Sequence, residues 1–234
     1  KRVEGARGRR SLLPRMRPLL VLLALLLLAS PPARACGPAT DCVVGDRSYR
    51  IRLPDLPPDG GRIGAILLAH GHRDTAANLM AQADLGTAVA GLGVALIAPQ
   101  SAGPGWALPG SPAGAVPAID EMAAIERVMA DALARFPIDP RRVMASGFSA
   151  GGMLVWNLAC QRAGLFAGFA PISGTFWEPV PAACPTGPAT VLHVHGLDDP
   201  VVPLAGRRIR EAKQGDVTEV LARYAAFGGF GRAE

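Results

Sequence analysis

The chain has 234 residues, of which half are hydrophobic and 18% are charged, a composition typical of one folded globular domain. Its formal net charge of +5 suggests a nucleic-acid or anionic-membrane partner. However, residues 1–35 hold eight Lys/Arg and one acidic residue, so the remainder carries a net charge of about −2, and no nucleic-acid partner is expected.

The first 35 residues have the pattern of an export signal. Arg15 and Arg17 precede the unbroken apolar run Leu19–Ala29, and the segment Ala33–Ala35 predicts cleavage at its end. The run is shorter than the roughly 20 residues that span a bilayer as a helix, so export is favoured over a stable membrane span. The chain begins with Lys rather than Met, and Met16 is therefore a candidate true start, with residues 1–15 upstream of it.

An exported protein meets oxidising conditions, in which cysteines tend to pair. Of the three possible pairings, two local bridges are favoured, Cys36 with Cys42 and Cys160 with Cys184. The cysteines and histidines do not show the spacing of a zinc site, so no metal is expected.

Short apolar runs alternate with longer helix-patterned segments from residue 36 onward, which is typical of parallel βαβ units. The expected strands are Tyr49–Leu53, Ile63–Ala69, Val94–Ala98, Arg142–Ser146, Gly168–Ile172 and Thr190–His195. The expected helices are Thr75–Leu92, Pro117–Phe136, Ala150–Arg162 and Asp216–Phe227, with a turn at Asp139-Pro140. The sequence therefore predicts one α/β domain over residues 36–234, with a mostly parallel sheet and helices on both faces.

The segment Gly147-Phe-Ser-Ala-Gly151 places a Gly-x-Ser-x-Gly motif between an expected strand and an expected helix. At such a turn the serine hydroxyl is exposed at the carboxyl edge of the sheet, and glycines let strand and helix approach closely. Ser149 is therefore the candidate nucleophile. The alternative is that Ser149 caps a glycine-rich helix start.

A nucleophilic serine needs donors for the developing oxyanion. In this kind of fold one donor is the N–H of the residue after the nucleophile, here Ala150, and the other comes from a loop after an earlier strand. His70-Gly71-His72 follows the strand ending at Ala69, and the N–H of His72 is the candidate loop donor. The imidazoles of His70 and His72 are expected to hold the loop in place rather than to take part in catalysis.

A carboxylate is expected just beyond the last strand, where it would orient the imidazole of a catalytic triad. The sequence His195-Gly-Leu-Asp-Asp-Pro200 offers Asp198 and Asp199, and spacing alone does not separate them. Asp199 is the favoured candidate. Alternatively, Asp198 and Asp199 belong to a solvated turn ahead of Pro200 and have no catalytic role.

Three segments together resemble the polyhydroxybutyrate depolymerase and feruloyl esterase group of secreted α/β-hydrolases. They are 136–143 (FPIDPRRV), 147–152 (GFSAGG) and 195–203 (HGLDDPVVP), and the resemblance covers roughly residues 36–230. It implies an α/β-hydrolase fold and ester hydrolysis through an acyl-enzyme, without metal or organic cofactor. In that group the final Asp of a His-Gly-x-x-Asp segment is the triad acid, which favours Asp199 over Asp198.

The family's catalytic histidine lies in a Gly-His segment beyond the acid, whereas all four histidines of this chain precede Asp199. The sequence as given stops where a last strand is expected. A fragment or frame-disrupted product of a complete enzyme is favoured over a natural protein that lacks the base. Very weak esterase activity is expected for this chain. Without the base, an oxyanion hole and substrate binding alone leave a rate enhancement of about 10³ to 10⁴ over the reaction in water.

Two tryptophans follow expected strand ends, Trp106 and Trp177, and are equally consistent with a substrate pocket and with loop packing. Trp156, on the helix after Ser149, is expected in the core. The sequence does not separate hydroxyalkanoate oligomers from feruloyl or acetyl esters as substrates. A non-catalytic binding protein on the hydrolase scaffold and a serine peptidase of the same fold remain alternatives.

Overall fold

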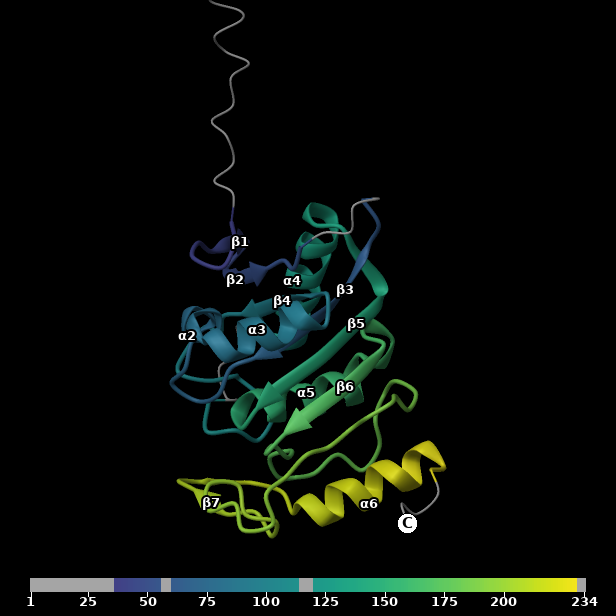
Figure 1. Ribbon diagram of the computed structural model, residues 1–234. Helices are drawn as coiled ribbons and strands as arrows, with labels where there is room; N and C mark the ends of the chain where they lie inside the picture. Colours follow the sequence, from purple (N-terminus) through teal and green to yellow (C-terminus); the bar gives the residue numbers. More distant parts are fainter. Residues whose placement is uncertain (1–35, 56–59, 114–119, 231–234) are drawn as a thin grey trace, which may run out of the picture. The chain divides into compact units, whose positions relative to one another are not determined.

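A computed structural model describes residues 36–55, 60–113 and 120–230, which contain a six-stranded sheet and a two-stranded hairpin (Figure 1). The order across the large sheet is β1-β2-β4-β3-β5-β6. Its strands are β1 (Cys42–Val44), β2 (Arg47–Arg52), β3 (Ile63–Ala69), β4 (Val94–Pro99), β5 (Ile138–Phe148) and β6 (Gly168–Ile172). The hairpin consists of β7 (Arg208–Ile209) and β8 (Ala212–Lys213).

The neighbouring strands β4, β3, β5 and β6 run parallel to one another, whereas β1 and β2 are antiparallel to their neighbours. β3 reads IGAILLA and is mostly buried, as expected for a strand covered on both faces. Because Ala69 pairs with Gly147 and Phe148 pairs with Ile172, the carboxyl ends of β3, β5 and β6 meet at one edge of the sheet. This is the edge at which open α/β sheets bind ligands.

Helices cover both faces of the sheet (Figure 1). Along β4, Leu96 and Ala98 pack in one apolar cluster with the pair α2 and α3, whereas Ala95 and Ile97 pack in another with α4 and α5, as strand alternation requires. The helices are α2 (Ala76–Ala81), α3 (Ala83–Gly91), α4 (Glu121–Arg135), α5 (Ala150–Gln161) and α6 (Val217–Gly228), with a 3-10 turn at Ala163–Leu165. The predicted α/β architecture is confirmed.

The single helix predicted over Thr75–Leu92 is instead two helices. Gln82 adopts an extended conformation with φ −73° and ψ 108°, which ends α2 and begins α3. The start of α2 follows the expected chemistry, because the Thr75 hydroxyl accepts a hydrogen bond from the Asn78 N–H at 3.1 Å. Asp120 and Asp216 cap α4 and α6 in the same way.

Two strand predictions need correction. β5 starts earlier than expected, because Ile138 already pairs with Ile63. The turn predicted at Asp139-Pro140 is instead a bulge inside β5, which lies before the next pair, Val143 with Ala65. The strand predicted over Thr190–His195 makes only isolated parallel bridges, of Phe169 with Val191 and of Ile172 with Val194.

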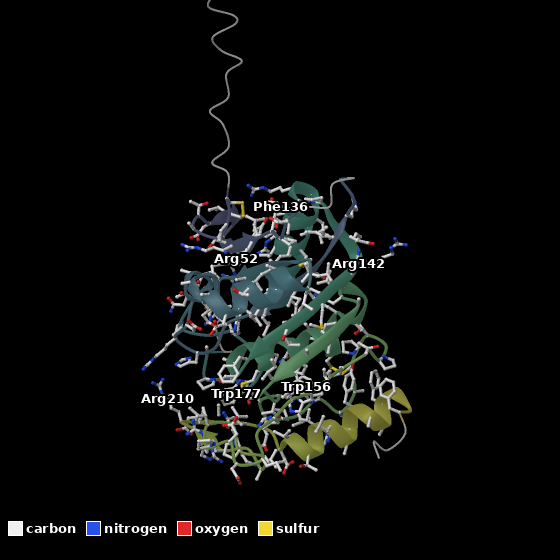
Figure 2. All side chains as sticks on the ribbon, in the orientation of Figure 1. Arg52, Phe136, Arg142, Trp156, Trp177 and Arg210 are labelled. Atoms are coloured by element: carbon white, nitrogen blue, oxygen red, sulfur yellow. A yellow bond between two sulfur atoms is a disulfide. The ribbon has the colours of Figure 1, made fainter. Side chains whose placement is uncertain are left out.

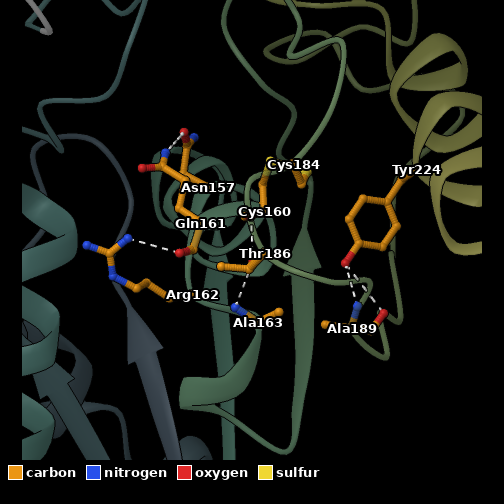
Figure 3. Close-up of a disulfide and its surroundings, with 9 residues drawn as sticks. All are labelled: Asn157, Cys160, Gln161, Arg162, Ala163, Cys184, Thr186, Ala189 and Tyr224. Carbon is orange, nitrogen blue, oxygen red and sulfur yellow. Dashed lines mark hydrogen bonds between the residues drawn. A yellow bond between two sulfur atoms is a disulfide. The ribbon is translucent and has the colours of Figure 1, made fainter.

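Disulfides join Cys36 to Cys42 and Cys160 to Cys184, the two pairs favoured from the sequence. Around the second bridge, the Thr186 hydroxyl donates to the Cys160 carbonyl at 2.8 Å (Figure 3). The hydroxyl of Tyr224, on α6, accepts from the Ala189 N–H at 2.9 Å. The long connection after β6 is therefore tied to the end of α5 and to α6.

The export signal predicted over residues 1–35 lies outside the described residues. Within the described ranges, none of the helices combines the length and the apolar character needed to cross a bilayer.

Candidate active site

Ser149 lies at a sharp turn between β5 and α5, where it has φ 55° and ψ −116°. A positive φ is strained for a residue with a side chain, and it persists here because the Ser149 N–H donates to the Ile172 carbonyl of β6 at 2.9 Å. The Ser149 side chain makes no capping hydrogen bond to α5. The cap interpretation of Ser149 is therefore wrong, and the hydroxyl is not used to begin the helix.

Glycines at two positions of the motif allow this turn. A Cβ on Gly147 would lie 2.4 Å from the Gly151 carbonyl oxygen, and a Cβ on Gly151 would lie 2.0 Å from the Ala69 carbonyl oxygen. Both distances are far below a van der Waals contact. The close approach of β3, β5 and the first turn of α5 therefore requires glycine at both sites.

Two backbone N–H groups are available beside Ser149. Ala150 is the first residue of α5, and an N–H in the first turn of a helix has no partner within the helix. Gly71 lies close to the serine, since a Cβ on it would be 3.9 Å from the Ser149 Cβ. The next residue, His72, lines the same cavity as Ser149 and Ala150, and its N–H donates to no acceptor among the described residues.

The imidazole of His70 holds two loops together. Its Nε2 accepts from the Ser101 N–H at 3.2 Å, so the proton is on Nδ1, which donates to the Gly71 carbonyl at 2.8 Å. Burial lowers the pKa of His70, which agrees with a neutral ring. The indole of Trp106 donates to the His70 carbonyl at 3.0 Å. This imidazole therefore has the structural role expected from the sequence.

Asp199 stands in a turn that holds its carboxylate. Its Oδ1 accepts from the N–H groups of Val201 at 2.8 Å and Val202 at 3.0 Å. The Val202 N–H, then the Val201 N–H and the Ser173 hydroxyl, lower the pKa of Asp199 because they favour the charged form, although burial opposes this shift. Asp198 is exposed and makes no hydrogen bond or ion pair among the described residues.

Ser149 and Asp199 lie at the same edge of the sheet. The Ser149 N–H bonds the last residue of β6, Ile172, and the next residue, Ser173, donates its N–H to the Val194 carbonyl at 2.8 Å. The Ser173 hydroxyl also contributes to the lowered pKa of Asp199. Ser173, the residue after β6, therefore lies between the turn that carries Ser149 and the segment that leads to Asp199.

Two further histidines form a partly buried pair behind Asp199. His195 Nε2 lies 2.7 Å from the Val202 carbonyl, to which it donates, and 3.9 Å from Asp199 Oδ2. His193 Nε2 lies 3.1 Å from His195 Nδ1, and desolvation, then the neighbouring His195, lower the pKa of His193 to about 4. Among the described residues, no histidine side chain hydrogen-bonds Ser149. This pair therefore braces the turn that carries Asp199.

A cavity of about 210 Å³ opens beside Ser149, with mostly apolar walls. Trp106 and Trp177 both line it and both are buried, so each serves loop packing and the cavity wall together. Trp156 lies in the core, as expected, and donates to the Gly174 carbonyl (Figure 2). The sequence did not indicate Arg207 or Gln214, which also line the cavity and come from the β7–β8 region.

A buried ion pair supports the loop that carries Trp106. Glu121, at the start of α4, accepts from the Ala107 N–H at 3.0 Å through Oε1 and pairs with Arg47 at 3.4 Å through Oε2. Both side chains are buried, so removal of Arg47 would leave the Glu121 carboxylate without its ion-pair partner in the interior. The cavity wall is therefore anchored to β2 and α4.

Comparison with known proteins finds relatives among esterases. The Phospholipase/Carboxylesterase family model matches residues 118–220. NocK from Nocardia uniformis subsp. tsuyamanensis, whose name assigns it to the esterases, is 33% identical over 182 residues, which are 75% of this chain and 52% of NocK. Feruloyl esterase C from Emericella nidulans is 31% identical over 112 residues, which are 47% of this chain and 37% of the relative.

Among solved structures, one published as a thermostable esterase matches with a TM-score of 0.53 at 21% identity, over 78% of this chain and 48% of that one. This likeness establishes the fold. The chain spans about half the length of NocK and little more than a third of feruloyl esterase C.

Proposed function

Because this chain is an α/β-hydrolase related to esterases, we propose that it carries the site of a serine esterase that hydrolyses carboxylic esters through an acyl-enzyme on Ser149. The observation that carries the proposal is the geometry of Ser149. Its backbone is held in a strained conformation, its hydroxyl makes no capping bond, and it faces a cavity. Strain of this kind is kept where it places a reactive group.

The chemistry follows from these positions. The Ser149 oxygen attacks the ester carbonyl carbon while its proton passes to a base, and the carbonyl oxygen becomes an oxyanion. The N–H groups of His72 and Ala150 bind this oxyanion. The bond to the alkoxy oxygen then breaks, and the alcohol leaves with a proton. Water attacks the acyl-serine in the same way and releases the acid.

Asp199 would orient and stabilise the imidazolium formed when the base takes the serine proton. Its lowered pKa keeps it ionised at neutral pH, as this role requires. An imidazole would have to contact both Ser149 and Asp199, and none of the described residues does so. The 234-residue chain should therefore respond to an imidazole supplied from solution.

The walls of the cavity favour an apolar group next to the ester carbonyl, since Trp106, Leu108 and Trp177 line it. Such a cavity suits feruloyl-type or hydroxyalkanoate esters, with acetyl esters as smaller alternatives. We further propose that the protein acts after export. The sequence pattern of residues 1–35 and two disulfides support an oxidising compartment.

The proposal is tested by hydrolysis of p-nitrophenyl butyrate by the purified chain with increasing imidazole concentration. We expect a rate that rises with imidazole above the protein-free reaction, and a loss of this increase, by about 100-fold, in Ser149→Ala. Ser48→Ala is the matched control, because Ser48 lies on β2 and does not line the cavity, so it should leave the rate unchanged. An equal response to imidazole in wild type and Ser149→Ala would contradict the proposal.

A further inference from the structure

The wall of the Ser149 cavity carries a positively charged side chain, that of Arg207. Arg207 lines it together with Ser149, and no Asp or Glu is among the described lining residues. Arg207 takes part in no ion pair within the described ranges, whereas Lys213 on the same hairpin is paired with Glu178 at 2.7 Å. Among the described residues, the charge of this cavity-lining arginine is therefore not paired with a carboxylate.

The Arg207 side chain is also held in position. Its Nε donates to the Val201 carbonyl at 2.7 Å, and Val201 itself lines the cavity. This bond uses one of the five guanidinium N–H groups and leaves the two terminal nitrogens free to donate. A fixed guanidinium with free terminal nitrogens matches the paired oxygens of a carboxylate.

The surrounding hairpin adds to the positive potential. Arg208 and Arg210 are exposed and have no ion pair among the described residues, and Figure 2 shows Arg210 pointing outward from the hairpin. Glu211 is the single acidic residue between Arg207 and Lys213. Charges of one sign beside an apolar cavity attract ligands of the opposite sign.

On the basis of the esterase function proposed above, we propose that Arg207 is a specificity-determining residue that selects ester substrates bearing a carboxylate. The ester carbonyl would lie at Ser149, the apolar part of the substrate along the tryptophan-lined wall, and the carboxylate at the guanidinium of Arg207. The carboxylate can belong to the acid part or to the alcohol part of the ester. Both alternatives share this recognition chemistry.

Two pairs of substrates separate the alternatives, each in the imidazole-supported assay. Mono-p-nitrophenyl adipate is compared with p-nitrophenyl 6-methylheptanoate, its uncharged isostere, to test the acid part. For the alcohol part, 4-acetoxybenzoate is compared with 4-isopropylphenyl acetate. We expect a roughly tenfold higher kcat/KM for the charged member of one pair, which added salt decreases.

Arg207→Gln should reduce that preference to about one by lowering kcat/KM for the charged ester. Arg208→Gln is the matched control, since Arg208 lies on the same hairpin and does not line the cavity. The proposal is overturned if Arg207→Gln keeps the preference, or if neither charged ester is preferred by the wild type. Because Arg207 is exposed, its substitution should not impair folding.

A binding measurement keeps this inference separate from the proposed reaction. In Ser149→Ala protein, methyl adipate monoanion should change the fluorescence of Trp106 and Trp177, and Arg207→Gln should weaken the binding about tenfold. Selective binding without hydrolysis by wild type would contradict the esterase function alone. Hydrolysis without selective binding would contradict the role of Arg207 alone.

Discussion

Replacing Gly151 by alanine is expected to destabilise the folded chain by about 4 kcal/mol or more. The new Cβ would lie 2.0 Å from the Ala69 carbonyl oxygen and 2.8 Å from that of His70. Both atoms belong to backbone and cannot move aside as a flexible side chain would. To make room, the first turn of α5 must move away from β3, which also displaces Ser149.

Urea unfolding followed by circular dichroism measures this effect, with soluble yield as a second readout if the variant does not fold. Gly91→Ala is the matched control. Gly91 ends α3, a Cβ on it would meet no atom within 4 Å, and alanine there should be neutral or stabilising by up to about 1 kcal/mol. A Gly151→Ala protein within about 1 kcal/mol of wild type would show that β3 and α5 do not approach this closely.

Asp199→Ala is expected to destabilise the chain by about 2 kcal/mol at pH 7, because the N–H groups of Val201 and Val202 lose their acceptor. Asp199→Asn retains an acceptor oxygen and should lose less. Asp198→Ala is the matched control and should have little effect, since Asp198 is exposed and makes no bond within the described residues.

The effect of Asp199 depends on pH in a defined direction. Its pKa in the folded chain is lowered below the ordinary aspartate value of 3.8, so the folded state favours the charged carboxylate. The stabilisation is complete above this value and is lost as pH falls through the folded-state pKa. The difference in unfolding free energy between wild type and Asp199→Ala should shrink below pH 4. A difference that grows on acidification would contradict the assigned bonds.

The sequence predicts the part of the fold that has strong local signals. β3, β4 and β6 match the expected ranges closely, since each is an unbroken apolar run bounded by polar or turn residues. The break at Gln82 has no such signal, because a glutamine is a normal helix residue and only the packing of α2 and α3 on β4 separates the two helices.

The strand prediction for residues 190–195 was wrong for a different reason. It is rich in apolar residues, but among the described strands it has a neighbour on one side alone, β6, and the pairing reduces to two bridges. Leu192 and Val194 are exposed on this segment. Local pattern cannot reveal a missing neighbour, because pairing is decided by residues far away in sequence.

For the site, the motif located Ser149 because its chemistry is local to the turn. Arg207 gave no signal, since an arginine in a polar stretch is normally a solvated surface residue. Its position depends on the return of the hairpin to Trp177, which pairs with Gln214. Left-handed backbone at Gly206 and Arg210 flanks and shapes this hairpin, and only the glycine could have been anticipated from the sequence.

The central claim is that Ser149 is the nucleophile, and covalent labelling tests it most directly. The purified chain is treated with a fluorophosphonate in the presence of imidazole, and the modified residue is identified by peptide mass spectrometry. We predict a single adduct on Ser149, formed faster as imidazole increases and absent from Ser149→Ala. Labelling of another serine, such as Ser111 or Ser173, or no adduct at any imidazole concentration, would contradict the claim.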